Sequence, residues 1–191
     1  SNLLISQLFG PAAVTPFTIA FKYYGIAATG FTIILTPFWS AYTDAYVRGD
    51  VAWIVSTFRR LKILWGGLVL AVVVMTAVAT PVYHFWLRGK QGVEIPFLLS
   101  AFTGIYIIVL MWSSMYVYFI NGVGKIRLQL WGGMITALTV IPLNILLAKI
   151  LGLGPAGVSL GMALSLLPWG FVWQIQMRKI LKGEARGIWD K

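Results

Sequence analysis

The sequence contains no cysteine and has very few charged side chains. Its 191 residues include five Asp or Glu and one His, and only 10% of the chain is charged, against roughly 25% in an ordinary soluble domain. The absence of cysteine excludes disulfides and thiolate metal sites. The shortage of charge excludes a soluble monomer, because such a chain would have too little polar surface to present to water.

Apolar side chains dominate what is present. The chain is 59% hydrophobic, with nine Trp and eight Tyr, and its mean hydropathy is +0.85. We therefore predict an all-α fold, a polytopic transmembrane helix bundle. The net charge of +10 would indicate nucleic-acid binding in a soluble protein. Here the basic residues flank apolar runs, so we expect contact with the lipid bilayer and no nucleic-acid partner.

Five apolar runs are long enough to cross the ~30 Å hydrocarbon core of a bilayer. The predicted spans cover residues of about 15–48, 63–83, 96–120, 128–151 and 158–177. The stretch 51–62 carries apolar residues on one helical face and basic residues away from it. That pattern predicts an interfacial helix lying in the membrane plane.

The chain is expected to belong to a larger protein. Its opening residues lack a Met and a basic signal region, and we interpret residues 1–9 as the end of a preceding transmembrane helix and the chain as a fragment. Residues 10–182 are then expected to form a five-helix transmembrane lobe. The residues from Arg178 to Lys191 are expected to be basic and frayed, and the tail 183–191 is expected to be cytoplasmic.

Local signals predict where helices begin, bend and approach one another. Thr15, followed by proline, predicts a helix N-cap. Pro37 lies inside the same apolar run and predicts a kink, because proline removes a backbone hydrogen bond. Asp50 is expected to cap the next helix. The small residues in Gly157-Val-Ser-Leu-Gly161 predict close approach of the last span to a neighbour.

The basic residues predict the orientation of the bundle. With the predicted spans, eleven fall on one side of the membrane: Arg48, Arg59, Arg60, Lys62, Lys125, Arg127, Arg178, Lys179, Lys182, Arg186 and Lys191. Three fall on the other side: Arg88, Lys90 and Lys149. By the positive-inside rule the first side is cytoplasmic, so we expect a multi-pass protein with a cytoplasmic C-terminus.

The first long run carries a stripe of small and hydroxylic residues, which we call the polar seam. Its members follow one another at spacings of three or four residues, close to the ~3.6 residues per turn of an α-helix, so they share one helical face. The seam consists of Thr18, Lys22, Gly25, Thr29, Thr32, Thr36, Ser40 and Thr43. A polar stripe on an apolar helix predicts a water-filled cavity, and we take the members from Thr18 to Ser40 as candidate substrate-binding residues.

Lys22 is the sharpest candidate in the seam. An ionisable residue within a span is a functional hypothesis by default, because burial without a partner is costly. The alternative is that Lys22 extends to the headgroups, with Tyr23 and Tyr24 beside it as an interfacial belt. For any single Thr or Ser of the seam, the alternative is a hydrogen bond to its own helix or packing against a neighbour.

Four further residues are interpreted individually, and two of them have two interpretations. Pro37 is a candidate hinge, and Asp44 is either a gating or ion-coupling residue or the partner of Arg48 one turn away. Asn144, close to Pro142, either satisfies broken backbone or faces a cavity. His84 is interpreted as a residue of the membrane interface.

Chemistry-bearing patterns are missing from the spans. The sequence has no paired carboxylates, Asp-rich magnesium motif, His cluster or nucleophile–base pair within a span, so we expect no enzyme activity, metal site or cofactor. None of the five acids lies in the middle of a predicted span. An ion-coupled exporter of cations usually needs such a carboxylate, whereas a basic stripe without acids suits an anionic cargo.

Four motifs follow one another in register along nearly the whole chain. They are Gln7-Leu-Phe-Gly-Pro with Ile19-Ala-Phe-Lys-Tyr-Tyr; Pro37-Phe-Trp-Ser-Ala-Tyr-Thr-Asp-Ala-Tyr with Arg48-Gly-Asp; Asn121-Gly-Val-Gly-Lys-Ile-Arg-Leu-Gln129; and Gly154-Pro-Ala-Gly-Val-Ser-Leu-Gly161. Together these motifs resemble the C-terminal half of Wzx-type O-antigen and polysaccharide flippases of the multidrug/oligosaccharidyl-lipid/polysaccharide exporter superfamily.

The resemblance implies one lobe of a two-lobed, MATE-like exporter with a central cavity. It implies transfer of a polyprenyl-diphosphate-linked oligosaccharide across the bacterial inner membrane by alternating access. The implied partners are this lipid-linked substrate, an N-terminal lobe and glycan polymerase machinery. Basic cavity residues of such proteins are thought to attract the diphosphate or acidic sugars, and Lys22 is the matching position here.

Two other functions stay open at this point. One is an ion-coupled exporter of small molecules or drugs from the same superfamily. The other is a non-transporting membrane scaffold of a glycan-synthesis complex.

Overall fold

The computed structural model describes residues 2–87 and 93–190 and is all-α over these residues. Within them, five helical stretches are long and apolar enough to cross a membrane, which confirms the predicted polytopic bundle. The elements are α1 (Asn2–Phe9), η1 (Pro11–Ala13), α2 (Val14–Leu35), α3 (Phe38–Val47), α4 (Val51–Ala77), α5 (Ala79–Trp86), α6 (Phe97–Val123), α7 (Arg127–Ile145), η2 (Leu146–Ile150), α8 (Gly154–Leu181) and η3 (Gly187–Asp190).

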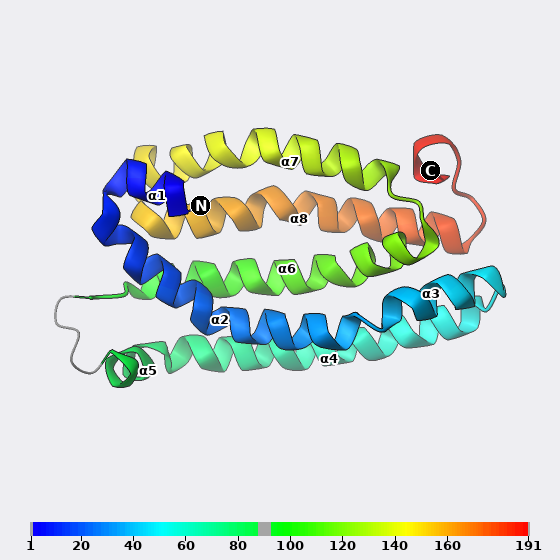
Figure 1. Ribbon diagram of the computed structural model, residues 1–191, viewed down its shortest axis with the longest axis horizontal. Coiled ribbons are helices and arrows are strands. Elements are labelled where there is room, and N and C mark those ends of the chain that lie inside the picture. Colours follow the sequence, from blue (N-terminus) through cyan, green and yellow to red (C-terminus); the bar gives the residue numbers. More distant parts are fainter. Residues whose placement is uncertain (1, 88–92, 191) are drawn as a thin grey trace.

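The long helices lie side by side, with α6 at the centre of the bundle (Figure 1). α8 and α4 pack on α6, α7 packs on α8, and α2 and α3 also pack on α6. The α3–α4 turn, the α6–α7 turn and the end of α8 lie at one end of the bundle (Figure 1). We call this the basic end, because it carries the described residues of the larger predicted basic group. Arg88, Lys90 and Lys191 of that orientation prediction lie outside the described residues.

The core is built mainly of aromatic and aliphatic side chains from α2, α3, α4 and α6. Tyr42 of α3 stacks on Phe58 of α4 with ring centroids 5.5 Å apart, and its ring meets Phe119 of α6 edge-on at the same distance. Such aromatic contacts stabilise beyond the area that they bury. They join α3, α4 and α6 near the basic end.

Glycines let α8 approach its neighbours closely, as the sequence predicts. A Cβ atom on Gly157 would lie 2.6 Å from the backbone nitrogen of Ala148 in η2, and one on Gly161 would lie 2.1 Å from Asn144 Oδ1. On Gly170 it would lie 2.3 Å from the Trp112 ring of α6. Small residues at these positions allow the helices to pack where lipid provides no hydrophobic driving force.

Proline and capping signals are confirmed in part. The first long helix breaks at Thr36 and Pro37, so the kink at Pro37 is observed. Asp50 caps α4 by accepting a 2.9 Å hydrogen bond from the Trp53 amide. Thr15 as an N-cap is wrong: a 3₁₀ turn, η1, leads into α2, which begins at Val14 with no side-chain cap.

Two segments differ from the prediction because they pack on the bundle. The stretch 51–62 is not a separate interfacial helix but the first half of α4, and its apolar face, including Ile54 and Phe58, is buried in the core. The tail is not frayed over its described part. Its η3 turn folds back so that Asp190 pairs with Lys125, and Lys179 Nζ lies 4.1 Å from the centroid of the Trp189 ring.

Candidate functional site

The polar seam lies on the exposed face of α2 and α3. Its Lys22, four threonines and one serine are exposed, and Thr18 and Gly25 are partly exposed. The opposite face carries the buried residues Phe17, Ala20, Tyr24, Phe31 and Leu35. The helical period that defines the seam therefore separates an open face from a packed one.

The seam hydroxyls mostly bond to their own helix. Thr36 Oγ1 donates to the Thr32 carbonyl at 2.8 Å, and Ser40 Oγ donates to the Pro37 carbonyl at 3.2 Å. This is the self-bonding alternative raised by the sequence. It uses the hydroxyl proton and leaves the oxygen lone pairs as acceptors on the exposed face.

Lys22 is the one cation of the seam. It stands eight residues after Val14, about 12 Å along α2, and its side chain is exposed. In the part of the chain that the structure describes, the one ion pair is Lys125–Asp190, so Lys22 has no carboxylate partner there. An unpaired cation at this depth can attract an anionic group or extend toward the headgroups.

Tyr23 and Tyr24 do not form an interfacial belt beside Lys22. Both are buried, and both reach α4: Tyr23 donates to the Met75 carbonyl at 3.1 Å, and Tyr24 donates to Thr76 Oγ1 at 3.0 Å. Sequence reasoning missed this connection. The period that defines the seam contained the signal, because it puts Tyr24 on the face of Phe31.

Gly25 lies in open space. A Cβ atom added to Gly25 meets no other heavy atom within 4 Å, and the same holds for Gly30 one turn and a half later. These glycines therefore do not serve helix packing, unlike Gly161 of α8. Because they have no side chains, these glycines leave the exposed surface of α2 without protruding groups at their positions.

Pro37 lies beside the seam, and Asp44 lies beyond it. Pro37 is exposed and follows the last turn of α2. Asp44 is exposed in α3, close to the basic end. The alternative in which Asp44 pairs with Arg48 is wrong, because no ion pair joins these described residues.

Asn144 is not brought together with the seam. It is 4% exposed at the end of α7, and its Oδ1 packs against Gly161 of α8 without a hydrogen-bond partner among the described residues. The π-helix η2 follows it directly. Asn144 thus lies at a helix–helix contact.

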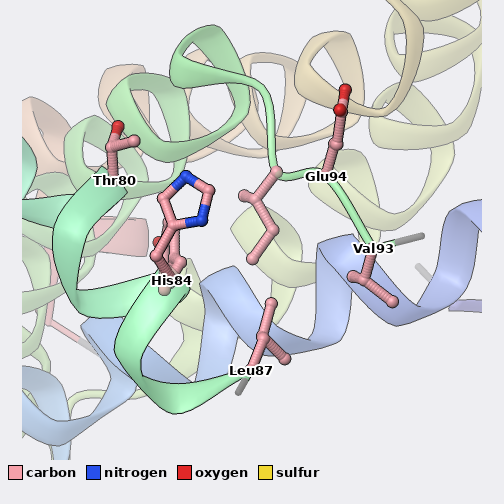
Figure 2. Close-up of a pocket in the computed structure, with 7 residues that line it drawn as sticks. Thr80, His84, Leu87, Val93 and Glu94 are labelled. Atoms are coloured by element: carbon pink, nitrogen blue, oxygen red, sulfur yellow. The ribbon is translucent and has the colours of Figure 1, made fainter. Parts of the chain in front are cut away.

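A pocket of about 430 Å³ lies at the end of the bundle opposite the basic end. Figure 2 shows Thr80 and His84 of α5 and Glu94 of the segment before α6 around it. No residue of the seam lines this pocket. His84 is exposed there, and the described residues hold no group of His, Cys, Asp and Glu that could bind a metal.

The seam therefore combines a spanning helix, exposed hydroxyls and a cation on one face. No protein-family model, curated protein or solved structure matches the chain.

Proposed function

We propose that this chain is one lobe of a flippase that moves a polyprenyl-diphosphate-linked oligosaccharide, an O-antigen or polysaccharide repeat unit, across the bacterial inner membrane by alternating access. The observation that carries the proposal is the exposed polar seam on a membrane-spanning helix. The motif resemblance described above supports the choice of substrate.

An exposed cation is expensive in hydrocarbon. Lys22 on α2 would cost several kcal/mol facing lipid at depth, and the apolar helices α4 and α7 supply lipid-facing surface elsewhere in the bundle. A seam that faces a water-filled chamber between this lobe and a second lobe avoids the cost. Such a chamber is the arrangement in which alternating access works by rocking of the two lobes.

The charge of the seam favours an anionic substrate. Lys22 is its one ionisable member, and its other members are hydroxylic or glycine. In this proposal the ammonium attracts the diphosphate or an acidic sugar, and the hydroxyl oxygens bind sugar hydroxyls or water. An exporter of cationic drugs would need the opposite charge.

The proposed orientation puts the basic end and the C-terminus in the cytoplasm. Ten described basic residues support it, since they belong to the larger predicted group: Arg48, Arg59, Arg60, Lys62, Lys125, Arg127, Arg178, Lys179, Lys182 and Arg186. Lys149 and Lys22 belong to the opposite half of the bundle. This asymmetry follows the positive-inside rule.

Replacement of Lys22 tests the proposal. Lys22→Ala and Lys22→Glu in the full-length protein are expected to lower surface glycan export, with the larger loss for Lys22→Glu, and Lys22→Arg is expected to retain export. The matched control is Lys149→Ala, which removes an exposed lysine from the same half of the bundle. Export is measured at equal protein level.

Unchanged export in both Lys22→Ala and Lys22→Glu would remove Lys22 from the mechanism. Full glycan export from cells that lack the whole protein would reject the flippase function itself. Drug resistance on overexpression, with no effect on glycan, would favour the exporter alternative.

A further inference from the structure

A basic groove lies between α4 and α8, near the basic end of the bundle. It has a volume of about 280 Å³, and no residue of α2 or α3 lines it. Helices α4 and α8 both pack on α6, which supplies Tyr116 to the groove. The groove is therefore separate from the seam and does not rest on the proposed function.

Three cations converge on the groove: Arg59 and Lys62 from α4, and Arg178 from α8. All three are exposed, and none forms an ion pair within residues 2–87 and 93–190. No acidic residue lines the groove. Three like charges without a counter-ion repel one another, so an anion would relieve this repulsion.

The rest of the lining is apolar apart from one amide and one phenol. The apolar residues are Val55, Phe58, Met177 and Leu181, and the polar ones are Gln174 and Tyr116. Phe58 and Met177 are largely buried, so they form a packed apolar wall of the groove. A ligand that fits must therefore be anionic at one end and apolar at the other.

The position of the cations fits a membrane lipid. Arg59 and Lys62 stand eight and eleven residues after Val51, about 12 and 16 Å along α4, and Arg178 lies one turn before the end of α8. Basic pockets between transmembrane helices toward one end of a bundle are suited to phospholipid headgroups. A soluble anion would find the charges but would leave the apolar wall uncovered.

We propose that this groove binds one anionic phospholipid, with its phosphate between Arg59, Lys62 and Arg178 and an acyl chain along the Val55–Leu181 wall. Gln174 also lines the groove, and its amide N–H would donate to the same phosphate. The bound lipid would join α4 to α8 across α6.

Lipid titration of the full-length protein in neutral detergent tests this. The probes are phosphatidylglycerol, phosphatidylcholine with the same acyl chains, and inorganic phosphate; the readouts are lipid retained in native mass spectrometry and the thermal unfolding midpoint. Phosphatidylglycerol is expected to be retained and to raise the midpoint, and the other two probes are not. The triple variant Arg59→Gln/Lys62→Gln/Arg178→Gln is expected to bind phosphatidylglycerol about tenfold more weakly, or weaker still.

The matched control is Arg60→Gln/Lys182→Gln/Arg186→Gln, which removes the same charge from exposed positions outside the groove. It is expected to bind like the unmodified protein. Equal weakening in both triples, unchanged binding in the groove triple, or equal binding of inorganic phosphate would each overturn the proposal. If the groove triple does not fold, the single variants Lys62→Gln and Arg178→Gln decide the question, and normal binding by both would overturn it.

Discussion

The Thr43 hydroxyl of α3 donates a 2.6 Å hydrogen bond to the backbone carbonyl of Gly122 in α6. At the same place the backbones of α3 and α6 come close together. A Cβ atom added to Gly122 would lie only 2.8 Å from the Trp39 carbonyl oxygen. Thr43 is exposed like its neighbours in the seam, but it differs from them because its hydroxyl bonds to another helix and fixes α3 to the centre of the bundle.

Gly122→Ala is expected to destabilise the protein by about 1–3 kcal/mol, because the added methyl group overlaps backbone atoms that cannot rotate away. The loss would appear as a lower thermal unfolding midpoint in detergent. Gly133→Ala on α7 is the control, since a Cβ atom there meets nothing within 4 Å and alanine favours a helix by up to about 1 kcal/mol. Equal midpoints for the two variants would contradict the close contact.

Cysteines at Thr29, Thr32 and Thr36 are expected to react with a charged, water-soluble thiol reagent in membranes, because the seam is proposed to face water. The chain has no cysteine of its own, so each variant adds a single target to this lobe, and any cysteine elsewhere in the full-length protein is replaced first. Leu138→Cys is the control: Leu138 is 75% exposed on the apolar helix α7 and is expected to face lipid and stay unmodified. If none of the three cysteines reacted with the reagent in working protein, the aqueous chamber would be excluded.

Pro37→Ala is expected to restore a backbone donor and to join α2 and α3 into one straighter helix. Stability should stay equal or rise, whereas transport should fall if bending at this point accompanies the movement of the lobes. Export at equal protein level and the thermal midpoint are measured together. Pro142→Ala in α7, which lies outside the seam, serves as the comparison; normal export in Pro37→Ala would show that the kink is not a hinge.

Asp190→Asn is expected to release the η3 turn from the bundle, because Asp190 pairs with Lys125. Trypsin cleavage at Arg186 should become faster, whereas Glu184→Gln, which removes an exposed acid without an ion pair, should leave it unchanged. Similar cleavage rates in both variants would show that the pair does not hold the tail.

The same pair has a defined pH dependence. Burial lowers the pKa of Lys125, but hydrogen bonds to Asp190 and Tyr46 outweigh it, and the pKa is raised overall. A raised pKa in the folded state means that the contribution is fully present below the ordinary lysine value of about 10.4 and is lost as the pH rises through the folded value. Cleavage at Arg186 in the unmodified protein, divided by the rate for a peptide of the same sequence, should therefore stay constant from neutral pH to about pH 10 and increase only above that.

Periodicity and single-residue signals account for what the sequence predicted correctly. Apolar run lengths identify the five spans, and Pro37 and Asp50 act on their own backbone, so the kink and the cap follow from local chemistry. The close approach at Gly157 and Gly161 is also a local signal, because only the missing side chain is needed.

The errors come from contacts between residues far apart in the chain. The amphipathic stretch 51–62 has the pattern of an interfacial helix, yet α3 and α6 cover its apolar face, so it joins α4. Tyr24 and Asp190 are polar residues whose partners, Thr76 and Lys125, lie 52 and 65 positions away. The exposure of Lys22 agrees both with a cavity residue and with a lysine that extends to the headgroups, so its role stays a prediction.

The glycine contacts of α8 divide the bundle mechanically. With Gly161 against Asn144 and Gly170 against Trp112, α6, α7 and α8 interlock and can shift past one another only by opening gaps in tightly filled space. By contrast, α2 and α3 are separated by a proline, and most of the seam on α2 is exposed. Bending would therefore be concentrated in α2 and α3, while α6, α7 and α8 behave as a single rigid block.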